Sequence, residues 1–163
     1  MEIKKFDIDF VRRTRRILTT YNGEYKLSNL INCTLGLIML PYENIRDCQN
    51  ALQNPNALWE INIDCISCLP GLELRIFNPI KKIKNGVIMY YPKTLKVLLQ
   101  KIRNGLAHQH IEPVNKNGKF IGVKIYNYFD NKYKTHMDLD VQFTRKQLQN
   151  FALFIADEYL KQV

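Results

Sequence analysis

The residues Arg103, Asn104 and His108 place a fixed cation, an amide and an imidazole within one short stretch of the chain. Arginine stays protonated at physiological pH, and its forked set of N–H donors matches the oxygens of a phosphate. Histidine gives or takes a proton near neutral pH. This combination of side chains predicts a site that cleaves a phosphodiester bond.

A helix is expected to carry these residues. Pro92 precedes a stripe of apolar residues at three- and four-residue intervals, so the stretch 93–109 predicts a helix with the motif in its last two turns. On an ideal helix, five residues at about 100° each separate Arg103 from His108 by about 140°. One helix alone therefore aims the two side chains poorly at a single atom.

The same helical spacing recurs in three other parts of the chain. It predicts a basic amphipathic helix over 8–20, a central buried helix over 24–40 that Pro41 ends, and a C-terminal helix over 145–161. Alternating apolar and polar residues predict two strands, 120–129 and 134–141, joined by a turn at 130–132.

The stretch 42–91 follows neither pattern for long, because prolines and Asn85-Gly86 interrupt it, and it predicts short helices and loops. We therefore expect a mainly α fold, a helical bundle with one β-hairpin between the motif helix and the C-terminal helix. The length of 163 residues suits a single domain that spans 1–163.

The chain is strongly basic. Lys plus Arg number 24 against 15 Asp plus Glu, and the net charge of +9 favours polyanionic partners, among which RNA, DNA and anionic membrane surfaces stay open. No apolar run is long enough to cross a membrane, and the N-terminus lacks the pattern of a secretory signal. These features predict a soluble, cytoplasmic protein without a membrane partner.

Cysteine and acidic residues give no convincing metal site. The four cysteines are sparse for this length and are expected to be reduced thiols. Cys65 and Cys68 have the spacing of half a zinc site, but no second pair of ligands follows, so ordinary thiols are the preferred interpretation. Asp138 and Asp140 alternate onto one strand face and would make a poor cation site by themselves. We predict no metal and no cofactor.

The string Arg103-Asn104-Gly105-Leu106-Ala107-His108 resembles the signature of the HEPN superfamily, the higher eukaryotes and prokaryotes nucleotide-binding domains. That signature is an arginine, often followed by a polar residue, with a histidine after four to six residues. The helix that ends in Leu37-Ile38-Met39-Leu40-Pro41 is similar to an early core helix of some members. The resemblance implies a HEPN-like helical bundle.

The resemblance also implies a chemistry, which is metal-independent cleavage of RNA. The ribose 2′-hydroxyl attacks the adjacent phosphate and leaves a 2′,3′-cyclic phosphate and a 5′-hydroxyl end. In that scheme His108 is the acid or base, Arg103 stabilises charge on the phosphoryl oxygens, and Asn104 orients a partner or the phosphate. Two copies of the motif would line one cleft of a homodimer. Such proteins serve as effectors of toxin–antitoxin or antiphage systems, so an antitoxin or regulatory protein is a further expected partner.

His110 departs from one known variant of the family. Some HEPN toxins carry a tyrosine two residues after the histidine, to which a partner enzyme attaches AMP, and this chain has His110 there. The difference argues against that form of silencing. His110 could assist at the site and bind RNA, or it could be an ordinary surface residue beside a loop.

Two other groups of residues suit RNA, and each also has a structural interpretation. A run of four arginines on the first helix could grip phosphates, or could form a solvated helix face; it comprises Arg12, Arg13, Arg15 and Arg16. Aromatic residues near the hairpin could stack on bases, or could pack across the strands; they are Tyr126, Tyr128, Phe129 and Tyr133.

Three alternatives to the nuclease stay open. Asn104 and His108 could simply bond to each other locally on a solvated helix face. The chain could be a non-catalytic HEPN-like module that binds RNA, a nucleotide or a protein, because a fold does not fix a function. It could also be a basic structural subunit of a larger complex.

Overall fold

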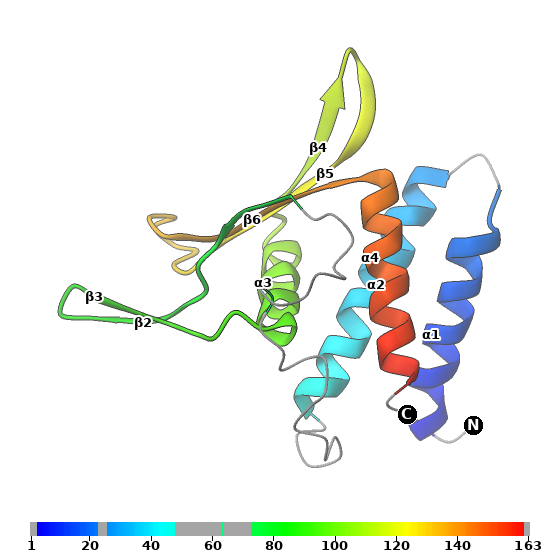
Figure 1. Cartoon of the computed structure of the whole chain (residues 1–163), viewed down its shortest axis with the longest axis horizontal. Helices are drawn as coiled ribbons and strands as arrows, with labels where there is room; N and C mark the ends of the chain where they lie inside the picture. Colours follow the sequence, from blue (N-terminus) through cyan, green and yellow to red (C-terminus); the bar gives the residue numbers. More distant parts are fainter. Residues whose placement is uncertain (1–2, 23–25, 48–62, 64–72, 162–163) are drawn as a thin grey trace. The chain divides into compact units, whose positions relative to one another are not determined.

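The computed structural model describes residues 3–22, 26–47, 63 and 73–161 (Figure 1). Within these residues the helices are α1 (Ile3–Thr20), α2 (Lys26–Asp47), α3 (Leu95–Ala107) and α4 (Arg145–Leu160). The strands are β1 (Glu73–Phe77), β2 (Ile80–Lys84), β3 (Val87–Tyr90), β4 (Ile111–Lys116), β5 (Lys119–Tyr128) and β6 (Met137–Thr144). None of the described helices is both long and apolar enough to cross a membrane.

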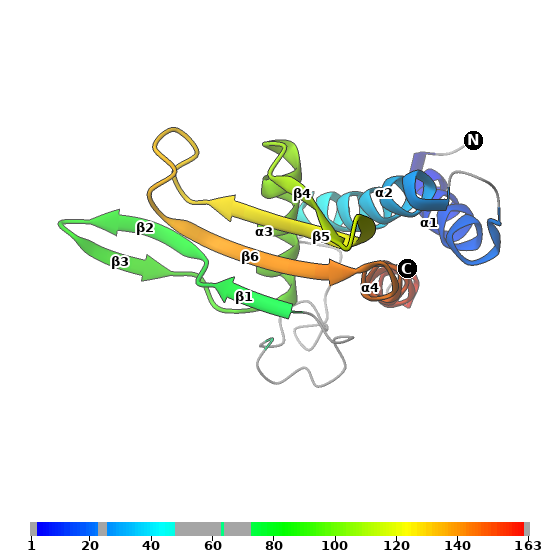
Figure 2. The same cartoon turned by 90° about the horizontal axis from the view of Figure 1, so that it is seen from above.

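The strands form two antiparallel sheets (Figure 2). The larger sheet has the order β1-β6-β5-β4, and β2 pairs with β3 in a separate two-stranded sheet. Asn-Gly pairs connect β2 to β3 and β4 to β5, and both residues of each pair have positive φ. Such turns match the right-handed twist of the flanking strands, so these two short motifs fix both hairpins.

The prediction of a mainly α bundle with one hairpin is wrong. The helices are accompanied by a four-stranded sheet and a second hairpin, which makes an α/β fold. The prediction of short helices and loops at 42–91 is also wrong, because residues 42–47 belong to α2 and the strands β1, β2 and β3 occupy most of the stretch from Glu73 onward. Residues 48–62 and 64–72 lie outside the described residues. The signal was present, because Asn85-Gly86 stands between two β-rich runs.

Strand β4 was also missed, because Pro113 lies in its middle. Proline has no N–H to donate to a ladder and is tolerated where that position faces no neighbour. Among the described strands, β4 lies at the edge of its sheet and pairs with β5 alone. The predicted hairpin is confirmed, since β5 and β6 pair with each other, but it is the centre of a larger sheet.

The four predicted helices are confirmed, although α1 begins five residues earlier than predicted, at Ile3, and α2 ends later. α2 continues through Pro41 to Asp47, so the prediction that Pro41 ends this helix is wrong. Proline removes a single backbone hydrogen bond from a helix. The helix buries a face formed by Cys33, Thr34, Leu37 and Ile38 just before that point, and we attribute its continuation to this packing.

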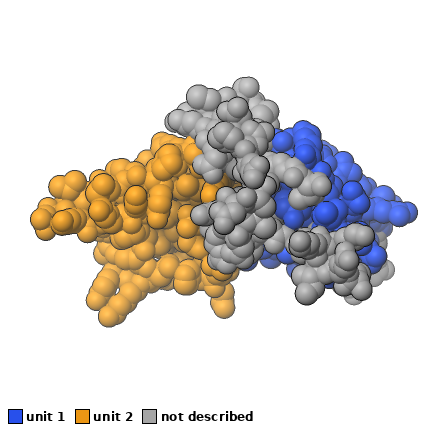
Figure 3. Space-filling view, turned by 90° about the horizontal axis from the view of Figure 1, so that it is seen from below, with its two compact units in different colours: residues 1–55, 146–163 blue, residues 56–145 orange. Residues whose placement is uncertain are grey.

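The chain divides into two compact units, coloured separately in Figure 3. Residues 1–55 and 146–163 form the first unit, which contains α1, α2 and nearly all of α4. Its buried side chains include Val11, Leu18, Leu37, Phe151 and Ile155. The single-domain prediction stays a prediction.

Residues 56–145 form the second unit, in which α3 packs against β5 and β6. Its fully buried side chains come from one face of α3 and one face of the sheet: Leu95, Leu98, Leu99, Ile102, Ile125, Leu139, Val141 and Phe143. The motif helix is therefore the single helix that covers this sheet within the described part of the unit.

Gly105 brings the end of α3 against β5. A Cβ atom at this position would overlap the Tyr126 carbonyl oxygen and lie 3.2 Å from Ile125 Cγ2. The Tyr126 oxygen is a backbone atom of the sheet, and the Ile125 side chain is fully buried. Neither atom can therefore move away from the added methyl group without a shift of the sheet. The glycine inside the motif is therefore required for helix-to-sheet packing.

Gly105→Ala is expected to destabilise the protein by about 1–3 kcal/mol, because the new methyl group must push α3 away from β5. Denaturant unfolding measures the change. Gly36→Ala is the matched control, since it adds the same methyl group to a helix where only the ring edge of Phe10 is near. Equal stability of the two variants would contradict the packing role of Gly105.

Candidate functional site

The motif occupies the C-terminal end of α3. The helix begins at the N-cap Thr94, whose side chain accepts a hydrogen bond from the Val97 N–H at 3.3 Å. At the other end the His108 N–H bonds to the Asn104 carbonyl oxygen at 3.1 Å, which makes His108 the C-cap. The last helical turn and its cap therefore hold all three predicted catalytic residues.

The structure brings two of these residues into direct contact. Arg103 Nη1 donates to Asn104 Oδ1 at 3.3 Å, and both side chains are half-buried. His108 is exposed where the helix ends. The amide thus orients the guanidinium, and the imidazole one turn further on is accessible to a substrate.

His110 is held at the start of β4 by its backbone. Its N–H bonds to the Gly105 carbonyl oxygen at 2.8 Å, and its own carbonyl accepts from the Tyr126 N–H at 3.1 Å. Gln109 adopts a positive φ of 58° to make this reversal. The end of α3 and the edge of the sheet are therefore linked through His110.

The His110 side chain is only 6% exposed, so it is not the surface residue that the sequence left open. Its ring stacks on Tyr126, with centroids 4.9 Å apart and planes at 16°, and meets the edge of Tyr128 at 5.6 Å. The His108 ring lies 6.0 Å from it. Two histidines therefore stand together, one exposed and one buried between aromatic rings.

Burial lowers the pKa of His110, and the positive charges of Lys134 and His108 lower it further. Its imidazole is therefore neutral at pH 7. Protonation is more favourable in the unfolded chain, where histidine has its usual pKa of about 6.5. Folding stability contributed by this residue is complete above that pH and is lost as the pH falls toward the lower folded-state pKa.

His110→Phe is expected to reduce the loss of stability between pH 7.5 and pH 5, because phenylalanine keeps the stack on Tyr126 and takes up no proton. Urea unfolding at both pH values measures this difference for each protein. His136→Phe serves for comparison, because it removes the loop histidine that lies 3.6 Å from Asp130 Oδ2 and leaves the stack of His110 on Tyr126 intact. An unchanged pH dependence in the His110 variant would show that this residue does not carry it.

A buried ion pair lies under the motif helix and was not predicted from the sequence. Lys101 Nζ is 2.6 Å from Asp138 Oδ2, and the two side chains are 7% and 0% exposed. Asn127 Nδ2 donates to Asp138 Oδ1 at 2.6 Å, and Lys101 also reaches the Ile80 carbonyl oxygen at 3.4 Å. These contacts tie α3 to β5, β6 and β2.

A β-bulge explains how the pair forms. Asn127 pairs with Leu139 and Tyr128 with Met137, so Asp138 is an extra residue without a partner on β5. A bulge re-aims a side chain relative to the regular alternation of a strand. Strand alternation would place Asp138 on the face of Asp140, whereas the bulge directs it toward Lys101.

Lys101→Met is expected to cost about 3–5 kcal/mol of folding stability, because it leaves the Asp138 charge buried without its cation. The double variant Lys101→Met/Asp138→Asn should recover much of this loss, since the amide keeps an acceptor for Asn127 and carries no charge. Guanidinium unfolding of the two variants tests the pairing. A double variant less stable than the single one would contradict it.

Comparison with known protein families matches residues 1–163 to the family described as HEPN pEK499 p136. The chain belongs to this HEPN family. The comparison supports a module of nucleotide-binding or ribonuclease type, and it confirms membership of the HEPN superfamily. Searches among curated proteins and among solved structures gave no match.

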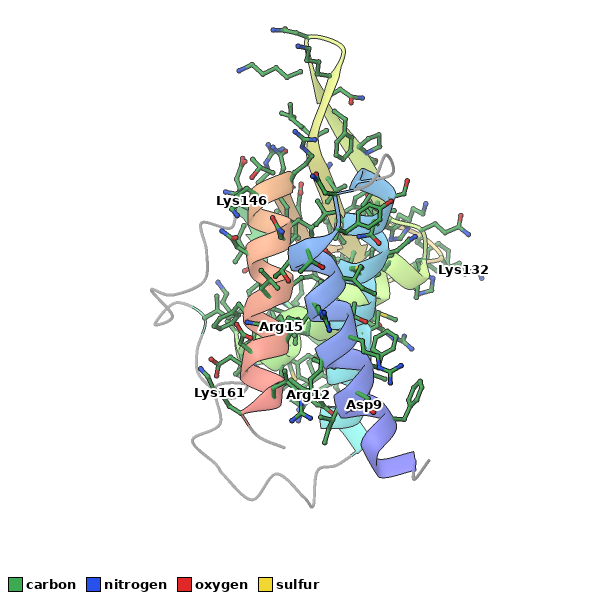
Figure 4. All side chains as sticks on the ribbon, turned by 90° about the vertical axis from the view of Figure 1, so that its right-hand side faces the viewer. Asp9, Arg12, Arg15, Lys132, Lys146 and Lys161 are labelled. Carbon is green, nitrogen blue, oxygen red and sulfur yellow. The ribbon has the colours of Figure 1, made fainter. Side chains whose placement is uncertain are left out.

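The arginine run of this HEPN chain lies on α1, in the first compact unit (Figure 4). Arg15 Nε bonds to Asp157 Oδ1 of α4 at 2.6 Å, which gives this arginine a structural partner. Arg12, Arg13 and Arg16 are exposed. The exposed members agree with either earlier interpretation, an RNA contact or a solvated face.

The cysteines and acidic residues considered as metal ligands form no metal centre within the described part of the HEPN chain. There, no three His, Cys, Asp or Glu side chains gather closely enough to hold an ion. Cys33 is a buried free thiol, and burial raises its pKa. Cys65 and Cys68 lie outside the described residues. Of the two predicted strand carboxylates, Asp138 is engaged by Lys101.

Proposed function

We propose that this HEPN protein is a metal-independent endoribonuclease. One observation supports it most: the exposed His108 ends α3, one turn beyond the hydrogen-bonded side chains of Arg103 and Asn104, in a chain of the HEPN family. The net charge of +9 also suits a polyanionic substrate.

In the proposed reaction, the ribose 2′-oxygen forms a bond to phosphorus while the bond from phosphorus to the 5′-oxygen breaks. A general base removes the 2′-hydroxyl proton, and a general acid gives a proton to the departing 5′-oxygen. An imidazole at position 108 suits either task near neutral pH. The permanently charged Arg103 stabilises the phosphoryl oxygens, and Asn104 holds the guanidinium in place.

We further propose that the site is shared between two copies of the chain. A twofold axis near the end of α3 would bring together two Arg103 and two His108 side chains, so that one histidine acts as the base and the other as the acid. The likeness to HEPN nucleases supports this homodimer. It likewise supports a cytoplasmic role as the effector of a toxin–antitoxin or antiphage system, with an antitoxin or other regulatory protein as partner.

His108→Ala is expected to lower the rate of cleavage of single-stranded RNA in EDTA by at least about 100-fold, because it removes a proton-transfer group. The fragments made by the wild type should carry 2′,3′-cyclic phosphate and 5′-hydroxyl ends. Electrophoresis measures the cleavage rate, and mass analysis identifies the fragment ends. Exposed loop histidine His136 supplies the matched control, and His136→Ala should cleave like the wild type.

Arg103→Ala should show the same loss as His108→Ala. Cleavage that survives both substitutions would exclude this site. If the wild type cleaves none of several RNAs, the non-catalytic binding module becomes the better description of the protein.

A further inference from the structure

The sheet has a polar, aromatic face on the side turned away from α3. Ile125 points at the helix, since its Cγ2 would lie 3.2 Å from a Cβ atom placed at Gly105. Neighbouring residues of a strand point to opposite faces, so Tyr126 points away from α3. The cross-strand partner of Tyr126 is Asp140, and directly paired residues share a face. This face also carries Lys124, two positions before Tyr126.

Two buried polar atoms on this face have no partner among the described residues. Nδ1 of His110 and Oδ1 of Asp140 each lack a hydrogen bond, and the two residues are 6% and 8% exposed. They lie on either side of Tyr126, which stacks on His110 and pairs with Asp140 across the strands. An unsatisfied buried polar group is costly, and two of them around one ring indicate a ligand that supplies their hydrogen bonds.

Cationic and aromatic groups complete the face. Lys124 Nζ lies 5.1 Å from the Tyr126 ring centroid and 3.8 Å from Asp140 Oδ2 and from Glu112 Oε2. Tyr128 meets both His110 and Tyr126 edge-on. We call His110, Lys124, Tyr126, Tyr128 and Asp140 the aromatic patch.

We propose that the aromatic patch binds a nucleobase of single-stranded RNA beside the phosphate presented to His108. The inference rests on the proposed ribonuclease function, to which it adds a base subsite. Position supports it, because the His108 ring is 6.0 Å from the ring of His110. Aromatic side chains with a nearby cation are the usual means by which proteins hold unpaired bases.

The donors and acceptors of the patch favour bases that carry an amino group. A carboxylate oxygen accepts a hydrogen bond from the exocyclic amine of cytosine or adenine, whereas uracil presents carbonyl oxygens in that place. Asp140 Oδ1 is the unused acceptor of the patch. The lowered pKa of His110 keeps its ring neutral, so that Nδ1 accepts or donates according to the tautomer. Lys124 Nζ lies 3.8 Å from the other carboxylate oxygen of Asp140, Oδ2, and so leaves Oδ1 available to a base.

The test measures binding without cleavage. The His108→Ala protein is titrated into short labelled oligomers of adenosine, cytidine and uridine, and fluorescence anisotropy gives each Kd. We expect tighter binding of the adenosine and cytidine oligomers than of the uridine oligomer. Adding Asp140→Asn should remove that preference, because an amide donates as well as accepts. Adding Tyr128→Ala should weaken binding of all three about tenfold or more.

Tyr90→Ala is the matched control, since this 54% exposed tyrosine belongs to the separate β2–β3 sheet. It should leave every Kd unchanged. Circular dichroism checks the fold of each variant, and if Tyr128→Ala does not fold, the nearly isosteric Asp140→Asn decides the question. Unchanged binding by Asp140→Asn, or no measurable RNA binding by the parent, would overturn the proposal.

Cleavage by the protein with His108 intact is measured in parallel to separate the two proposals. Base-dependent binding without cleavage would reject the ribonuclease and keep the patch. Cleavage with binding that is indifferent to Asp140 and Tyr128 would reject the patch and keep the ribonuclease.

Discussion

The close approach of α3 to β5 at Gly105 is the contact on which the candidate site depends. A side chain there would collide with the backbone carbonyl of Tyr126. Gly105 lies between Arg103 and His108, so the residue that allows the packing is itself part of the motif. Its carbonyl oxygen then accepts from the His110 N–H, so the chain passes directly from the helix end into the sheet.

The buried ion pair restricts the same helix near its middle, about one turn before Gly105. Lys101 meets Asp138 in a region where neither side chain reaches solvent, and Asn127 satisfies the second carboxylate oxygen. Such a pair adds little to net stability, because burying both charges is costly. It favours one arrangement of α3 on the sheet, because any shift that separated Lys101 from Asp138 would leave a buried charge without its partner. We infer that the pair and Gly105 together hold α3 in one position on the sheet, which the proposed site shared by two copies would require.

The two histidines show how one local sequence can supply two different environments. His108 caps a helix and is exposed, whereas His110 enters an edge strand and is enclosed by Tyr126 and Tyr128. Burial and neighbouring positive charge lower the pKa of His110. An exposed imidazole suited to proton transfer thus stands beside a neutral, fixed one suited to recognition.

The sequence by itself determined the family, the four helices, the central hairpin and the chemical types of the motif. These depend on local patterns, since helical spacing, strand alternation and a short string of residues are visible without knowledge of distant contacts. It did not predict β1, β2, β3 or β4. For β4, Pro113 shows why: a proline is compatible with a strand only at a sheet edge or a bulge, and strand order is a property of the whole fold.

Only the tertiary structure decided the surroundings of the motif. The sequence placed Asp138 on the same strand face as Asp140, and a bulge turned it toward Lys101 instead. It offered His110 as a loop residue, and pairing across 16 positions of the chain buried it against Tyr126. Both outcomes depend on which strands meet and in which register, and these are contacts between distant parts of the chain that no local pattern encodes.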